Sequence, residues 1–176
     1  MCGIVGYVGP RNTQDVLLDG LRRLEYRGYD SAGIAVISNG GIQVRRKKGK
    51  LTELTELLAN EKLGSHIGIG HTRWATHGPP SDENAHPHQA GGVALVHNGI
   101  VENYRALKEE LVREGREFKS ATDTEIIAHL IDRERAKGKK LPEAVRDAIA
   151  QVEGTYSLAV IAKDDPTEFV AARCGS

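Results

Sequence analysis

Cysteine is scarce in this sequence, with two residues in 176, and membrane-length apolar runs are absent. With only Cys2 and Cys174, the chain has no disulfide framework, which favours a reducing compartment. The N-terminus lacks the basic and apolar regions of a signal peptide, and no apolar stretch is long enough to span a bilayer. We therefore expect a cytoplasmic protein with no membrane partner.

An excess of charge of either sign is absent as well. Lys and Arg number 24, and Asp and Glu also number 24. A nucleic acid would meet no strong attractive field, so we expect no nucleic-acid partner. The basic run at 45–48 follows a strand-like segment and is typical of a solvated strand edge. With 39% hydrophobic and 27% charged residues, the composition is that of a soluble globular protein, and the length suits one domain.

Short apolar segments alternate with amphipathic ones along the chain. The patterns predict strands at 4–8, 31–38, 42–46, 67–69, 93–96, 156–162 and 169–172. They predict helices at 14–26, 51–60, 102–114 and 142–152, and another that begins after 122–125. Several strands follow one another as hairpin-like pairs, without strict βαβ alternation. This order favours an α+β fold of antiparallel sheets layered with helices.

Three local expectations accompany these elements. In the helix at 51–60, Leu54, Leu57 and Leu58 are expected to face the core. Residues 122–125 have the spacing of a capping box at a helix start. The polar stretch at 71–92 is long for a loop in a compact domain, and loops of that length are more often functional than idle.

Cys2 directly follows Met1. Cysteine is small enough for aminopeptidases to remove a preceding methionine, which would leave one residue with both a thiol and a free α-amino group. A thiol needs a nearby base to attack well at neutral pH, and an α-amino group titrates close to that range. The position therefore fits a nucleophile that carries its own base. The start of a buried strand is the alternative, since free cysteine is often buried.

Four segments hold most of the unusual polar residues. They are Cys-Gly-Ile at 2–4, Arg-Gly-Tyr-Asp-Ser-Ala-Gly at 27–33, His-Thr-Arg-Trp-Ala-Thr-His-Gly at 71–78, and His-Asn-Gly at 97–99. In this order they resemble the glutaminase domain of class II glutamine amidotransferases, which are N-terminal nucleophile hydrolases. The second and third segments are the most specific, and they are most similar to the branch whose acceptor is fructose 6-phosphate.

The resemblance implies a four-layer αββα fold, with two stacked antiparallel sheets between helices. It implies that 2–176 form a type-2 glutamine amidotransferase domain that is incomplete at its C-terminus. The sugar isomerase domains would then be absent, and with them the fructose 6-phosphate site and the main contacts of the parent homodimer. It implies no cofactor.

The resemblance also implies roles for single residues. Cys2 would attack the side-chain amide of L-glutamine and form a γ-glutamyl thioester, releasing ammonia and then glutamate. The side chain of Asn98 and the backbone N–H of Gly99 would stabilise the developing oxyanion. Arg73 would bind the α-carboxylate of glutamine, and Asp123 its α-ammonium group.

Four further residues complete the implied site. Thr76 and His77 would line the amino-acid pocket. Trp74 would be a mobile lid that, in the parent family, also gates the passage of ammonia. Arg27 would lie near Cys2 and help to hold its thiolate, because a nearby cation favours the charged form of a thiol.

Taken without the resemblance, four of these residues keep simpler interpretations. Asn98 and Gly99 form a common hairpin-turn signal, and on the residues alone the turn is favoured. Asp123 has the position of a charge or cap at a helix N-terminus. Trp74 is the single tryptophan and fits a core anchor.

Three other functions stay open on the sequence. Five histidines lie between 71 and 97, but no Cys-x-x-Cys or His-Glu-x-x-His spacing accompanies them, so we expect no metal. A non-catalytic glutamine-binding or regulatory fragment would keep the binding residues without turnover. Another class II amidotransferase would keep the same chemistry with a different acceptor.

Overall fold

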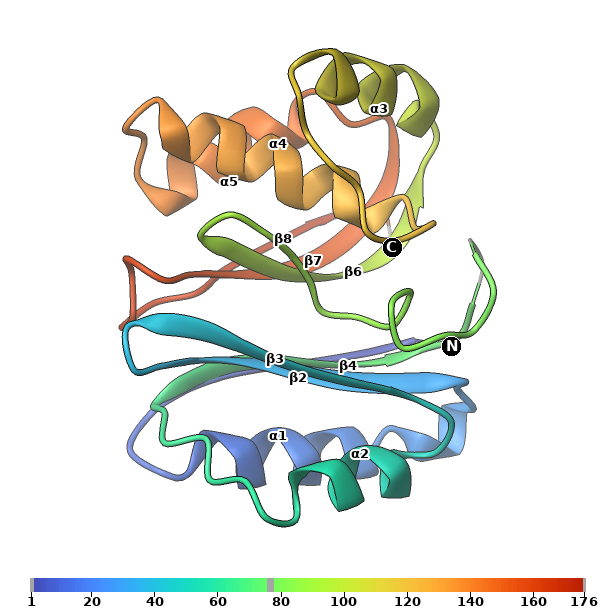
Figure 1. Cartoon of the computed structure of the whole chain (residues 1–176), viewed down its shortest axis with the longest axis vertical. Helices are drawn as coiled ribbons and strands as arrows, with labels where there is room; N and C mark the ends of the chain where they lie inside the picture. The colour runs from blue at the N-terminus through green and yellow to red at the C-terminus, as the bar shows by residue number, and fades with distance from the viewer. Residues whose placement is uncertain (1, 76–77, 176) are drawn as a thin grey trace.

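The computed structural model describes residues 2–75 and 78–175, which fold into four layers. Two helices lie under one sheet, a second sheet stacks on the first, and three helices cover the second sheet (Figure 1). Every strand pairing is antiparallel. The predicted α+β class and the four-layer αββα arrangement are therefore confirmed.

The first half of the chain builds the lower two layers. Its sheet has the order β1-β4-β2-β3, with β1 at Gly3–Val8, β2 at Ser31–Ser38, β3 at Gly41–Lys48 and β4 at Ile67–Arg73. Its helices are α1 at Thr13–Arg22, the short 3-10 helix η1 at Glu25–Arg27, and α2 at Leu51–Leu58.

The second half builds the upper two layers. Its sheet has the order β5-β6-β7-β8, with β5 at His88–Ala90, β6 at Val93–Val101, β7 at Gly154–Ala162 and β8 at Val170–Cys174. Its helices are α3 at Tyr104–Arg113, α4 at Thr124–Ala136 and α5 at Leu141–Ile149. None of the helices in the described ranges is long and apolar enough to cross a membrane.

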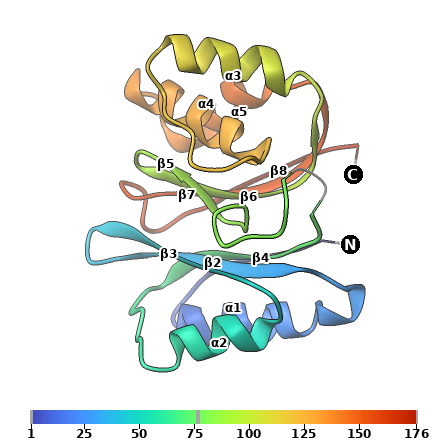
Figure 2. The same cartoon turned by 45° about the vertical axis from the view of Figure 1, so that its right-hand side comes forward.

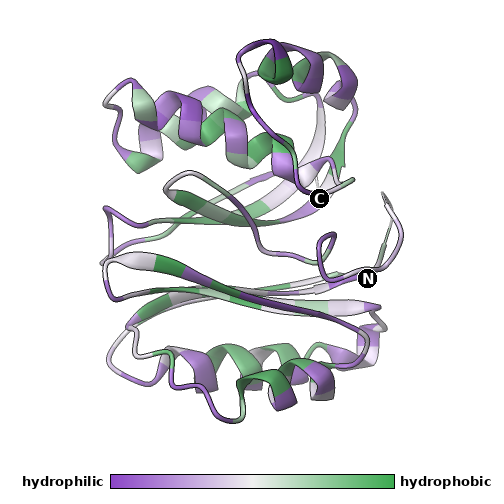
Figure 3. Ribbon diagram, in the orientation of Figure 1, coloured by the Kyte–Doolittle hydropathy of each residue, from purple (hydrophilic) through white to green (hydrophobic). Residues whose placement is uncertain are grey.

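Strand β2 shows why two sheets stack here. All eight of its residues are buried, because both faces of its sheet are covered. Ile34 and Val36 pack toward α1 and α2, whereas Ala35 and Ile37 pack against the second sheet. This is the two-residue alternation of a strand, and each large apolar side chain buried in this way contributes roughly 1.5–3 kcal/mol. The helices carry both hydrophobic and hydrophilic residues, as expected of helices that cover one sheet face (Figure 3).

Two predicted helices differ from the structure. The first ends at Arg22 instead of residue 26, since Leu24 and Arg27 continue in 3-10 geometry toward Gly28, which has a positive φ of 73°. In α2, Leu57 is 42% exposed, so the expectation that it faces the core was wrong. Leu51, Leu54 and Leu58 occupy the buried stripe and leave Leu57 outside it.

The predicted capping box does not form at the start of α4. The Thr122 hydroxyl lies 3.0 Å from Nε2 of His88, and the Glu125 carboxylate accepts backbone N–H groups from Lys119 and Ser120. Burial disfavours the charged form of Glu125, but the hydrogen bonds outweigh it and lower its pKa to about 2. The two side chains thus fasten the loop before the helix instead of accepting each other's backbone N–H groups.

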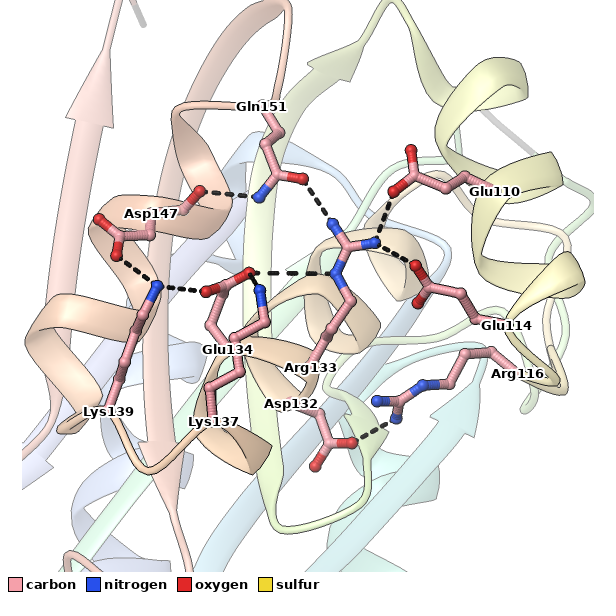
Figure 4. A network of polar contacts seen from close by, with 10 residues as sticks. All are labelled: Glu110, Glu114, Arg116, Asp132, Arg133, Glu134, Lys137, Lys139, Asp147 and Gln151. Atoms are coloured by element: carbon pink, nitrogen blue, oxygen red, sulfur yellow. Dashed lines mark hydrogen bonds and ion pairs between the residues drawn. The ribbon is translucent and has the colours of Figure 1, made fainter.

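A polar network on the outer side holds α4 between α3 and α5 (Figure 4). Arg133 of α4 donates to Glu110 of α3, to Glu114 directly after α3, and to Gln151 after α5. Lys139 bridges Glu134 and Asp147. Because most of these partners are partly exposed, each ion pair adds little stability alone, but together they fix the position of α4, whose N-terminus approaches the sheets.

Candidate active site

Cys2 lies at the start of β1, next to the end of β4. Gly3 pairs with Thr72, which brings Cys2 beside Trp74. The Trp74 backbone N–H donates to the thiol sulfur at 3.1 Å, and the same sulfur lies 3.6 Å from the Trp74 carbonyl oxygen. The N-terminus thus lies at the level where the two sheets meet (Figure 2). The half-buried thiol is held by backbone and stays accessible.

Asn98 reaches the same place from the other sheet. Its amide nitrogen Nδ2 donates to the backbone carbonyl of Cys2 at 3.3 Å, and its Oδ1 lies 2.7 Å from Nε2 of His71. Asn98 and Gly99 lie inside β6, which continues to Val101. The hairpin-turn interpretation of Asn-Gly is therefore wrong, and the predicted strand at 93–96 was too short.

Gly99 is required by its surroundings. Its φ is +139°, and a Cβ atom at this position would lie 1.9 Å from the carbonyl oxygen of Thr155 on the neighbouring strand β7. No side chain fits there, so β6 can pass β7 closely only with glycine. The backbone N–H of Gly99 directly follows the residue that contacts Cys2.

Arg73 is 3% exposed at the end of β4. Its Nη2 donates to the carbonyl of Gly78 at 3.2 Å. Burial lowers the pKa of Arg73, while the nearby charges of Asp30, Cys2 and Asp123 act to raise it. The structure thus places the predicted carboxylate-binding Arg73 in the electrostatic field of both Cys2 and Asp123.

Asp123 is the N-cap residue of α4 and is 5% exposed. It forms no cap with its side chain; Oδ2 instead accepts the backbone N–H of Val101 at 2.8 Å. This bond joins the start of α4 to the end of β6. One carboxylate oxygen is fixed by the backbone, and the group sits where the partial positive charge of a helix N-terminus favours an anion.

Asp30 supports the segment that holds the thiol. Its Oδ2 accepts the backbone N–H of Ala75, Oδ1 accepts the Ser31 hydroxyl at 3.0 Å, and its own backbone N–H donates to the Arg73 carbonyl at 2.7 Å. These bonds fix the chain on both sides of Trp74. Asp30 therefore anchors both the end of β4 and Ala75, the two neighbours of Trp74.

Trp74 is 55% exposed, so the core-anchor interpretation was wrong. Its ring covers Gly28, where a Cβ would come within 2.8 Å of Cζ3. Arg27 donates from Nε to the Tyr26 hydroxyl at 3.2 Å. Its predicted support of the Cys2 thiolate stays a prediction. The two predicted pocket residues Thr76 and His77 lie outside the described residues.

Three buried histidines, His71, His86 and His88, form a stack that sequence reasoning missed, and a fourth, His97, shares the Thr124 hydroxyl with His86. The His71 and His86 rings lie 4.3 Å apart, and the His86 and His88 rings 4.7 Å apart. Burial is the main cause that lowers the pKa of His71 to about 4 and of His88 to about 3. It also lowers the pKa values of His86 and His97, so these rings are neutral at pH 7. In the described part of the chain, no three His, Cys, Asp or Glu side chains converge to hold a metal ion.

The family assignment rests on a match to a known domain. Residues 71–174, more than half of the chain, match the family model of the glutamine amidotransferase domain. The chain belongs to this family. The matched range includes Arg73, Asn98, Gly99 and Asp123, whereas Cys2 lies before it.

The curated relatives are similar over nearly the whole chain. Glutamine–fructose-6-phosphate aminotransferase (isomerizing) of Thermus thermophilus is 58% identical over 98% of this amidotransferase domain, and that of Mesorhizobium japonicum is 54% identical over 99%. The chain spans only 28% and 29% of the lengths of these relatives.

A solved structure shares the fold. Glutamine phosphoribosylpyrophosphate amidotransferase from B. subtilis, complexed with ADP and GMP, has a TM-score of 0.81 and 27% identity. The match covers 98% of this chain and 37% of that one. The amidotransferase domain described here therefore has the N-terminal nucleophile hydrolase fold that the sequence motifs implied.

Proposed function

We propose that this chain hydrolyses the side-chain amide of L-glutamine to glutamate and ammonia, with Cys2 as the nucleophile. The observation that carries the proposal is the hydrogen bond from the Asn98 side-chain amide to the backbone carbonyl of Cys2, at 3.3 Å. A nucleophile and a neutral hydrogen-bond donor, held by two different sheets, are the two parts that acyl transfer requires.

The reaction proceeds in two steps. The Cys2 sulfur attacks the amide carbon of glutamine and passes its proton to a base, which delivers it to the departing nitrogen, so that ammonia leaves and a thioester remains. Water then adds to the thioester and releases glutamate and the free thiol. With Met1 removed, the α-amino group of Cys2 is the base. In each step the carbonyl oxygen becomes an oxyanion, which Asn98 Nδ2 and the Gly99 N–H stabilise.

Two buried charges give the site its preference for an amino acid. The Arg73 guanidinium binds the α-carboxylate, since its planar donors match a carboxylate bidentately. Asp123 binds the α-ammonium group with the carboxylate oxygen that the Val101 N–H does not occupy. Both side chains are buried, so a ligand that carries both charges compensates both at once. We assign Thr76 and His77 to this pocket, and Trp74 to its cover, from their places in the motif at 71–78.

We propose that the ammonia is used at an acceptor site in the part of the relatives that this chain does not match, since the chain spans 28% of the length of one of them. The names of the curated relatives point to fructose 6-phosphate, and 58% identity to one of them supports the same acceptor, with glucosamine 6-phosphate as the product. A homodimer of that longer protein and a cytoplasmic location stay predictions, as does the division of the chain into one amidotransferase domain at 2–176.

The test combines intact mass with glutamate release from glutamine by the wild type and by Cys2→Ala. We expect a mass without Met1, and glutamate only when Cys2 is intact. Calorimetry with glutamine separates the alternative: a folded chain that binds glutamine but releases no glutamate is a binding module, and the hydrolase proposal is then wrong.

A further inference from the structure

Asn98 can serve as an oxyanion donor only in one orientation of its side-chain amide. The nitrogen Nδ2 faces Cys2, and the oxygen Oδ1 faces His71. Rotating the amide by half a turn would exchange them and present an oxygen to the developing oxyanion. Because Nδ2 carries two hydrogens, it donates one to the Cys2 carbonyl and keeps one for the substrate.

We propose that His71 is a positioning residue that holds the Asn98 amide in its donating orientation. This inference rests on the proposed function, in which Asn98 stabilises the oxyanion, and it adds a residue that does not touch the substrate. Its basis is the 2.7 Å contact between His71 Nε2 and Asn98 Oδ1. An amide oxygen only accepts, so this contact is a hydrogen bond only if Nε2 carries the proton.

The surroundings of His71 keep the ring neutral and in place. It is fully buried in β4, between its pairing partners Ile4 and Gly33. Burial lowers its pKa to about 4, so at neutral pH the ring holds one proton. With this proton on Nε2, His71 can donate to Asn98 Oδ1 but cannot accept a hydrogen bond from Asn98 Nδ2. The ring then favours only one orientation of the Asn98 amide.

The histidine stack extends this arrangement to α4. The His86 ring packs 4.3 Å from the His71 ring, and its Nε2 lies 2.9 Å from the hydroxyl of Thr124. Nδ1 of His97 lies 3.0 Å from the same hydroxyl. Thr124 is the first residue of α4 and follows Asp123. The ring that orients Asn98 is thus linked, through the His86 ring, to the helix start that carries the proposed ammonium-binding carboxylate.

The first experiment reads the tautomer directly and does not need turnover. Long-range 1H–15N NMR spectra of the wild-type chain at pH 7 distinguish a histidine protonated on Nε2 from one protonated on Nδ1. We expect His71 to be neutral with its proton on Nε2, and we expect the Asn98 side-chain amide resonances to shift in His71→Leu. A proton on Nδ1 of His71 would overturn the inference whatever the activity.

The second experiment separates positioning from packing. His71→Leu keeps most of the buried volume and removes the donor, and we expect kcat to fall by about 10- to 100-fold with little change in KM. His71→Gln restores a donor on a side chain of similar reach and should recover much of that loss. The matched control is His88→Leu. It removes a ring from the same stack, but the His88 ring contacts Thr122 and not Asn98.

A double-mutant cycle gives the decisive comparison. In an Asn98→Ala background, His71→Leu should cause no further fall in kcat, because there is no amide left to orient. Equal kcat losses in His71→Leu and His88→Leu, or independent losses in the double variant, would show a packing effect and overturn the inference. If the wild type releases no glutamate, the proposed function fails, and the NMR result still decides how His71 holds Asn98.

Discussion

The side-chain amide nitrogen of Asn98 lies 3.3 Å from the backbone carbonyl oxygen of Cys2, although 96 positions separate the two residues. Cys2 precedes the edge strand β1 of one sheet, and Asn98 belongs to β6 of the other. The stacking of the sheets therefore sets the distance between the proposed nucleophile and the proposed oxyanion donor.

This relationship predicts that Asn98→Ala lowers kcat strongly and KM little. Loss of one oxyanion donor typically lowers kcat by about 10²–10³-fold, because the interaction strengthens only as negative charge develops. Steady-state glutamate release measures both constants. A variant that retains wild-type kcat would remove Asn98 from the mechanism.

Gly99→Ala is expected to damage the fold as well as the activity. A Cβ would lie 1.9 Å from the Thr155 carbonyl oxygen and would require a φ of +139°, so we expect a loss of at least about 2 kcal/mol in the free energy of unfolding. Gly64→Ala is the control, since nothing lies within 4 Å of its Cβ position, and it should stay within about 0.5 kcal/mol. Urea denaturation compares the two, and equal stabilities would contradict the close approach of β6 and β7.

Asp123→Asn tests the ammonium site without disturbing the backbone. The amide oxygen of asparagine can still accept the Val101 N–H, while the negative charge is lost. We expect KM for glutamine to rise by about 10- to 100-fold, since a charge-assisted hydrogen bond contributes roughly 1.5–3 kcal/mol, and kcat to change less.

The same change on the outer side of α4 provides the control for Asp123. Asp132→Asn removes a carboxylate that pairs with Arg116. It should leave KM unchanged, because the pair lies in the outer network of that helix (Figure 4). If both variants raise KM equally, the effect comes from the stability of α4 and not from recognition of glutamine.

Much of this architecture could be predicted because its signals are local. Hairpin-like strand pairs and amphipathic helices predicted the α+β class, and four motifs in order indicated the site. The Asn98–Gly99 pair misled the residue-based interpretation, because a dipeptide typical of turns occurs here inside a strand. Glycine is needed in this strand because no space is left for a side chain at residue 99. The Thr155 carbonyl oxygen, on a strand more than fifty residues away, fills that space.

The histidine stack could not be predicted for a similar reason. The loop that carries His86 and His88 is held by Arg46 of β3, which donates to the carbonyls of Glu83, Ala85 and Pro87. No pattern within 71–92 reveals that an arginine from another strand fastens the loop between the sheets. The missing ligand spacings argued against a metal site at the five clustered histidines, but nothing in the sequence indicated that three of them stack in the interior.

Buried neutral histidines also make stability depend on pH. Burial lowers the pKa of His71 from 6.5 to about 4 and that of His88 from 6.5 to about 3. Between these values the unfolded chain binds more protons than the folded one, so the free energy of unfolding decreases as the pH falls. The stabilising effect of keeping the rings neutral is fully present above pH 6.5, and each ring contributes a slope of up to about 1.4 kcal/mol per pH unit below it. Glu125, whose pKa is lowered from 4.5 to about 2, adds a slope of the same sign below pH 4.5.

Urea denaturation at intervals from pH 7.5 to pH 4.5 measures this slope, and His88→Leu supplies the comparison. The variant should be less stable at pH 7, because the ring also packs and bonds to Thr122. Its stability should nevertheless fall less steeply with decreasing pH, since the unfolded variant has one histidine fewer to take up a proton. Parallel curves for the two proteins would mean that the His88 ring takes up protons equally in the folded and unfolded states, and that its burial does not hold it neutral.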